Sequence, residues 1–158
     1  MSSASTGGRS PSRRYVFAAL LRRGYPLGEC LAARGAADSL TPLEQAQRIA
    51  GVASDKLASD IAILDMRPVC SYTDYFVICT AQNPRQAKAV FDEVHERLKR
   101  EDRLVPHNVD RAGEARWILA DYLDVVLHVF TPEARAYYRL EELWGDVPSV
   151  EVGVATVA

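Results

Sequence analysis

The stretch RWILADYLDVVLHVF, residues 116–130, contains two apolar runs on either side of a short acidic gap. The runs RWILA and DVVLHVF predict a pair of β-strands joined by the residues DYL. Asp121 and Asp124 lie at this predicted turn, and the aromatic residues Trp117 and Tyr122 flank it. Carboxylates beside aromatic rings are compatible with a catalytic centre or with a docking surface, so the rest of the sequence has to distinguish the two.

Two further strands are predicted upstream of this pair. DIAILDM, residues 60–66, has apolar residues on both alternating faces, as expected of a strand that is covered on both sides, and YFVICT, residues 75–80, has the same pattern. The connection between them, residues 67–74, is long enough for a hairpin. A short strand is predicted near residues 104–107, followed by a polar loop around NVDRAGE, residues 108–114.

A helix is predicted ahead of the first strand. In the sequence TPLE, Thr41 is the expected N-cap, Pro42 the first helical residue and Glu44 the third, which together form a capping box. The helix is expected to run to about Ser59. Its predicted buried stripe consists of Leu43, Ala46, Ile49, Ala50, Ala53 and Leu57.

Two more helices follow the strand segments. Asn83 is expected to cap a helix that runs to about Glu101, with Gln86 completing a capping box. The predicted buried stripe of this helix consists of Ala87, Val90, Phe91, Val94 and Leu98. Thr131 is expected to cap a last helix that ends at Gly145. Helical spacing places Tyr137, Leu140, Glu141 and Trp144 on one face of this last helix, where they are expected to cover the sheet.

The order of these elements predicts one α/β domain in which helices pack on a mixed β-sheet. A chain of 158 residues is long enough for one such domain with a tail at either end. We assign the domain to residues 41–148. Residues 149–158 lack periodicity and are expected to form a loose C-terminal tail. Residues 1–40 form a basic extension, which is expected to be disordered over the Ser-, Gly- and Arg-rich residues 1–14 and weakly helical after them.

Charge divides the chain into two parts. The extension holds six arginines against two carboxylates, a net +4, so the total of −2 leaves −6 for residues 41–158. An acidic body gains little from releasing counterions on phosphate backbones, so direct nucleic-acid binding is not expected, and a basic protein partner suits it better. No apolar run approaches the roughly 18 residues that a membrane span needs, so no membrane association is expected.

The extension leaves two localisations open. Its Arg- and Ser-rich, acid-poor composition is also that of an organelle transit peptide. Arginine outnumbers lysine by 16 to 3 over the whole chain, however, so the bias is not confined to the extension, and a bacterial cytoplasmic protein is the preferred interpretation. The three cysteines, Cys30, Cys70 and Cys79, form no C-x-x-C pair and are expected to be reduced thiols, as in a cytosol-like compartment.

The acidic gap is a weak candidate for catalysis. Metal-dependent nucleotidyl transfer needs converging carboxylates and usually a Gly-rich phosphate loop, and the chain offers Asp121 and Asp124 without such a loop. Turn formation, protein contact and catalysis remain alternatives for these two residues, in that order of preference. We expect no catalytic residue, no metal and no cofactor.

The aromatic residues and the histidine of the same stretch favour a contact role over chemistry. His128 alternates with Val126 and Phe130, so it is expected to be a satisfied, partly buried histidine and not an acid–base group. Trp117 and Tyr122 flank a turn next to aspartates, a composition typical of an interface with a basic partner.

Three segments in this order, SYTDYFVICTA, WILADYLDVVLHVF and EARAYYRLEELWGDVP, resemble the ribosomal silencing factor (Iojap-like) family over about residues 41–148. The resemblance implies a fold similar to nucleotidyltransferases but without their catalytic carboxylates. It also implies a steric function: members of the family bind the fourteenth protein of the large ribosomal subunit and prevent the small subunit from joining, which represses translation when nutrients are short.

The resemblance assigns partner-binding roles to individual positions. The positions that match are Thr73 and Asp74 in a T-D pair, Trp117 and Tyr122 as contact positions, Asp121, Asp124 and His128 as recurrent polar positions, and Arg135, Tyr138, Leu140, Glu141, Leu143 and Trp144 in the closing helix. Two positions depart from the family pattern. Asp110 and Arg111 stand where Glu-Gly is usual, and Leu123 stands where Gly is common, which predicts a turn without a positive φ at that residue.

Two other functions remain open. One is a metal-dependent enzyme similar to nucleotidyltransferases, suggested by the two aspartates and by the fold analogy. The other is a homodimeric interaction module that pairs through a sheet edge or a helix and is unrelated to ribosomes.

Overall fold

Thr41 and Glu44 start the first helix of the domain, as the sequence predicts. The computed structural model describes residues 40–71, 73–112 and 114–152. Within it, the Thr41 hydroxyl accepts a hydrogen bond from the Glu44 amide, and the Glu44 carboxylate accepts one from the Thr41 amide. This capping box opens helix α2 (Pro42–Asp55). The predictions for residues 1–39 and 153–158, including the disordered extension, lie outside the described residues.

Helix α2 is shorter than its sequence pattern predicts. It ends at Asp55, and Leu57 follows in a left-handed conformation with φ 62°. Leu57 is 80% exposed and Leu43 36%, so the prediction that both belong to the buried stripe is wrong. The other four predicted residues of the stripe, Ala46, Ile49, Ala50 and Ala53, are buried.

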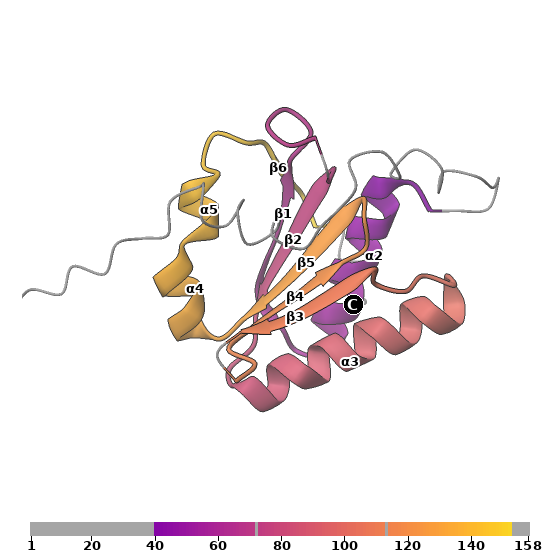
Figure 1. Cartoon of the computed structure of the whole chain (residues 1–158), viewed down its shortest axis with the longest axis vertical. Coiled ribbons are helices and arrows are strands. Elements are labelled where there is room, and N and C mark those ends of the chain that lie inside the picture. The colour runs from indigo at the N-terminus through magenta and orange to yellow at the C-terminus, as the bar shows by residue number, and fades with distance from the viewer. Residues whose placement is uncertain (1–39, 72, 113, 153–158) are drawn as a thin grey trace, which may run out of the picture.

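Six strands form one mixed sheet in the order β3-β4-β5-β2-β1-β6 (Figure 1). The strands are β1 (Ser59–Asp65), β2 (Tyr75–Thr80), β3 (Asn108–Ala112), β4 (Trp117–Asp121), β5 (Val125–Phe130) and β6 (Ser149–Val150). Neighbouring strands are antiparallel except β2 and β5, which run parallel with Tyr75 opposite Val125 and Thr80 opposite Phe130. This confirms the predicted α/β class, the mixed sheet and the hairpin between β1 and β2.

Helices cover both faces of the sheet. Helix α2 and helix α3 (Pro84–Glu101) pack on one face, and helix α4 (Pro132–Tyr138) and helix α5 (Leu140–Leu143) lie on the other (Figure 1). Each face has its own apolar core. The predicted stripe of α3 is confirmed, since Ala87, Val90, Phe91, Val94 and Leu98 are all buried. Strands β2 and β5 are buried along their whole length because both of their faces are covered.

The predicted strand near residues 104–107 is displaced along the chain. The structure places strand β3 at Asn108–Ala112, within the segment predicted to be a polar loop. This segment pairs with β4 along its length, from Asn108 opposite Asp121 to Ala112 opposite Trp117. Polar residues are tolerated there because β3 is an edge strand and has a neighbour on one side only.

The C-terminal predictions are wrong at two points. The last helix does not run unbroken to Gly145, because Arg139 adopts a left-handed conformation with φ 47° and separates α4 from α5. The loose tail predicted from residue 149 begins instead with strand β6, where Ser149 and Val150 pair with Leu64 and Ile63 of β1. Strand β6 therefore pairs with the outer side of β1 and forms the end of the sheet opposite β3.

Candidate functional site

The residues predicted to bind a partner do not form one site. Thr73, Asp74, Asp121, Tyr122 and Asp124 gather around the turn between β4 and β5, whereas Trp117, Arg135 and Tyr138 lie around the opposite end of these strands. Strand β4 separates the two groups by about 13 Å, the rise of four residues in a strand. The groups also involve opposite faces of the sheet, since Tyr122 belongs to the core under α2 and α3 and Trp117 packs against the core under α4 and α5.

The first group holds a turn together. The Leu123 amide donates to Asp121 Oδ1 over 2.8 Å, and the Tyr122 amide donates to the Val125 carbonyl over 2.9 Å. Leu123 has φ 76°, so the prediction of a turn without a positive φ is wrong. The Asp121 carboxylate fixes the amide of the strained residue, which agrees with the turn-forming interpretation of this aspartate.

Thr73 and Asp74 anchor the same turn from the neighbouring hairpin. The Thr73 hydroxyl donates to the Asp124 carbonyl over 3.0 Å, and the Asp74 amide donates to the same oxygen over 2.9 Å. Thr73, Asp121 and Tyr122 are each more than nine-tenths buried. These three side chains are thus used inside the fold, and their predicted contact with a partner stays a prediction.

Burial also determines the ionisation of Tyr122. Loss of solvent raises the pKa of its hydroxyl well above the ordinary range. The hydroxyl has no hydrogen-bond partner among the described residues. Tyr122 therefore stays neutral and contributes its ring to the core.

The second group is built around the indole ring of Trp117. Its ring centroid lies 4.5 Å from that of Tyr138, 5.2 Å from that of Phe130 and 5.9 Å from that of His128. Trp117 and Tyr138 are half-buried. Tyr137, whose ring centroid is 5.1 Å from that of Tyr138, is 57% exposed. We refer to Trp117, Tyr137 and Tyr138 as the aromatic edge.

The break at Arg139 explains why Tyr137 belongs to this edge. An unbroken helix would place Tyr137 on the face of Leu140 and Trp144, against the sheet. In the structure Leu140 and Trp144 are buried and Tyr137 points away, while its neighbour Tyr138 packs on Trp117. Sequence spacing could not reveal this exchange, because the left-handed residue shifts the phase of the helix.

His128 lies behind the aromatic edge and is fully buried. Its Nδ1 accepts a hydrogen bond from Trp117 Nε1 over 3.2 Å, and its ring meets that of Phe76 edge-on at 4.8 Å. Burial lowers the pKa of His128 to about 3, so the imidazole is neutral at physiological pH. The prediction of a satisfied histidine holds at Nδ1, whereas Nε2 has no partner among the described residues. The imidazole does not reach the surface of this chain, and its predicted role in binding a partner stays a prediction.

Arg135 fastens helix α4 to the sheet. Its guanidinium donates to the Thr80 hydroxyl and to the Asp60 carbonyl, both over 2.6 Å, and forms an ion pair with Glu141 at the start of α5. The side chain is 16% exposed, at the wall of a surface pocket of about 660 Å³. The guanidinium of Arg135 therefore makes these hydrogen bonds within the fold, and its predicted contact with a partner stays a prediction.

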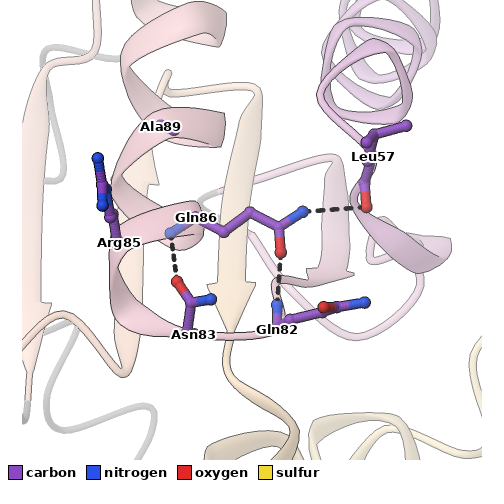
Figure 2. Close-up of a pocket in the computed structure, with 6 residues that line it drawn as sticks. All are labelled: Leu57, Gln82, Asn83, Arg85, Gln86 and Ala89. Carbon is purple, nitrogen blue, oxygen red and sulfur yellow. Dashed lines mark hydrogen bonds between the residues drawn. The ribbon is translucent and has the colours of Figure 1, made fainter.

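A second pocket, of about 420 Å³, lies where α3 begins (Figure 2). Gln86 crosses it: its amide nitrogen donates to the Leu57 carbonyl over 3.2 Å, and its amide oxygen accepts from the Gln82 amide over 2.8 Å. Asn83 caps the helix as predicted, with its side-chain oxygen accepting from the Gln86 amide. The second hydrogen bond of the predicted capping box is not formed with Asn83, because the Gln86 side-chain oxygen accepts from the Gln82 amide. The polar groups of this pocket thus tie α2 to α3.

The described residues contain no group of three or more His, Cys, Asp or Glu side chains placed to hold a metal ion. Cys70 and Cys79 are free and buried, and burial raises the pKa of the Cys79 thiol to about 12. None of the helices described is both long enough and apolar enough to cross a bilayer. The aromatic edge is a candidate functional surface because Trp117 is only half-buried and Tyr137 beside it is exposed.

Comparisons with known proteins agree with one another. A sequence model of the family described as "Ribosomal silencing factor during starvation" matches residues 39–157. The ribosomal silencing factor RsfS of Bacillus subtilis is 39% identical over 103 residues, which cover 65% of this chain and 86% of that protein. The mouse protein named mitochondrial assembly of ribosomal large subunit protein 1 is 33% identical over 91 residues, covering 55% and 39% respectively. A crystal structure from Chromobacterium violaceum is similar with a TM-score of 0.64 at 30% identity, and covers 74% of this chain and 98% of that chain.

Proposed function

Because the chain belongs to the family of ribosomal silencing factors, we propose that it binds the large ribosomal subunit and prevents the small subunit from joining. The proposed contact is the fourteenth protein of the large subunit, and the proposed result is repression of translation when nutrients are short. Relatives are named as silencing factors and not as enzymes. Occlusion of one subunit by another needs an interface and no chemical step.

The observation that carries this proposal is the aromatic edge. Trp117 is half-buried, its ring contacts three others, and its indole N–H donates a hydrogen bond, while the nearby Tyr137 is exposed. Trp and Tyr are the residues that most often carry binding energy at interfaces, because they bury a large area with few rotatable bonds. A rigid ring at the surface loses little entropy on binding.

Charge supports a basic partner. The chain from residue 41 onward carries −6. On the same face of the sheet as Trp117, register places Asp110 of β3 opposite Leu119 of β4. Carboxylates near an aromatic anchor attract a lysine- or arginine-rich surface and orient it during encounter. Proteins that bind ribosomal RNA are typically of this basic kind.

Co-sedimentation with purified ribosomal subunits tests the proposal. We expect the protein to pellet with large subunits. With small subunits we expect no more protein in the pellet than in the background control. Leu57→Ala is the matched control for any aromatic-edge variant. It also removes an exposed apolar side chain, 80% exposed, but one that lines the pocket in Figure 2 and does not belong to the aromatic edge. Failure of the wild-type protein to pellet with large subunits would contradict the proposed function.

A further inference from the structure

We infer that His128 is a positioning residue for docking: its Nδ1 accepts the Trp117 indole N–H and fixes the orientation in which the ring meets the partner. The inference rests on the proposed function, because it assigns a role within the same docking surface. It replaces the expected direct contact of His128 with an indirect one, exerted from the core.

The register of the sheet makes this contact possible. Trp117 of β4 pairs with Phe130 of β5, and His128 pairs with Leu119. Trp117 and His128 are therefore diagonal neighbours on one face of the sheet, a separation that long aromatic side chains can bridge. The two rings are inclined by 25° with centroids 5.9 Å apart, and Nε1 of Trp117 reaches Nδ1 of His128 over 3.2 Å.

Stacking alone does not fix the direction of the indole. An indole ring turned over about its Cβ–Cγ bond keeps its plane and so can still stack on Phe130, but its N–H then points away from the imidazole. The indole N–H is a donor only, and a neutral imidazole offers one acceptor nitrogen. The hydrogen bond therefore selects one of the two orientations that stacking permits.

The surroundings keep the acceptor available. The rings of Phe76, Trp117 and Phe130 pack around His128, and the side chain is fully buried. A protonated imidazole would donate at both nitrogens and could not accept. Burial disfavours that form, so Nδ1 remains an acceptor across the physiological pH range.

Two substitutions separate orientation from stability. His128→Phe keeps a ring of similar size and removes the acceptor, whereas His128→Asn places a side-chain oxygen near the position of Nδ1 and leaves space unfilled. We expect His128→Phe to keep or raise the thermal midpoint and to weaken large-subunit binding about tenfold. We expect His128→Asn to lower the midpoint and to bind within about threefold of the wild type.

A double-mutant cycle with Trp117→Phe, which keeps a stacking ring but has no N–H, gives a second measurement that does not depend on the Asn variant. In that background His128→Phe is expected to cause no further loss of binding.

The indole N–H signals in a ¹H–¹⁵N spectrum, assigned with Trp144→Phe, give a third measurement, on the free protein. The Trp117 signal is expected to shift, and its proton to exchange faster with solvent, in His128→Phe.

The outcomes are distinguishable. Wild-type protein that does not bind large subunits overturns the proposed function together with this inference. Wild-type protein that binds, with His128→Phe binding equally well, overturns the inference alone. Affinities that follow the thermal midpoints of the variants assign His128 a structural role only and also overturn it.

Discussion

Burial determines what His128 can do, because an imidazole without nearby water stays neutral. Its chemistry is reduced to one accepted hydrogen bond, from the indole of Trp117. Asp121 is similarly committed to the amide of Leu123. The sequence identified these residues as notable but could not tell which side chains reach the surface. Trp117 and Tyr122 stand five positions apart in the same stretch, and only the strand between them shows that they belong to opposite faces.

At the residue scale, the first prediction concerns acid stability. The pKa of His128 is lowered to about 3 in the folded state. Between that value and about 6.5, the unfolded chain therefore binds a proton at His128 and the native state does not. The free energy of unfolding is therefore lost progressively as the pH falls below about 6.5, and this group contributes about 2 kcal/mol of loss between pH 7 and pH 5. Urea unfolding of wild type and His128→Phe at both pH values measures it, and equal losses in the two proteins would refute the assignment.

The second prediction concerns Leu123. A residue with φ 76° is strained when it carries a Cβ, and glycine relieves that strain. Leu123→Gly is expected to leave the free energy of unfolding unchanged or to raise it by up to about 1 kcal/mol. Leu123→Val is the matched variant and is expected to lower it, because a β-branched residue is least tolerated there. Chemical denaturation decides, and a larger loss for Gly than for Val would contradict this account of the turn.

At the element scale, the position of α4 depends on one arginine and one break. Arg135 ties α4 to β2 through Thr80 and to α5 through Glu141. Arg139, at φ 47°, separates the two helices and lets Tyr138 reach Trp117. Helix caps and the buried stripe of α3 were predictable from sequence because they depend on neighbours a few residues away. The anchoring of α4 was not, because Arg135 finds its partners Asp60 and Thr80 in β1 and β2, more than fifty residues earlier.

The third prediction compares two arginines. Arg135→Ala is expected to cost about 1.5–3 kcal/mol, because it removes charge-assisted hydrogen bonds from a side chain that is mostly buried. Arg97→Ala also removes ion pairs, with Asp55 and Glu93, but these are more exposed, so the loss of stability is expected to be smaller than for Arg135→Ala. Urea midpoints measure both, and an equal loss would show that Arg135 does not hold α4 in place.

At the scale of the whole molecule, the sequence predicted the class of fold but not the order of its strands. Pairs that are close in the chain, β1 with β2 and β4 with β5, follow from short connections. The parallel pairing of β2 with β5 joins segments fifty residues apart, and β6 closes an edge from a segment without periodicity. The candidate site was likewise only partly predictable. Residues of one sequence stretch lie at two ends of the sheet, and the sequence did not predict that Tyr137 belongs to the aromatic edge.

The fourth prediction concerns salt. An acidic body that approaches a basic surface is attracted over distances that salt screens. Raising KCl at constant Mg²⁺ is expected to slow association with large subunits several-fold and to change dissociation little. Stopped-flow or surface-based kinetics separate the two rates. An association rate that does not respond to salt would remove charge complementarity from the account.

The most direct test of the central claim is inhibition of subunit joining by wild-type protein and by Trp117→Ala, each titrated into purified subunits with Leu57→Ala as control. The wild type and the control are expected to block joining with the same midpoint. Trp117→Ala is expected to need a concentration about thirtyfold higher, as for the loss of an anchor of about 2 kcal/mol, while remaining folded. Equal inhibition by a folded Trp117→Ala protein, or no inhibition by the wild type, would contradict docking through the aromatic edge.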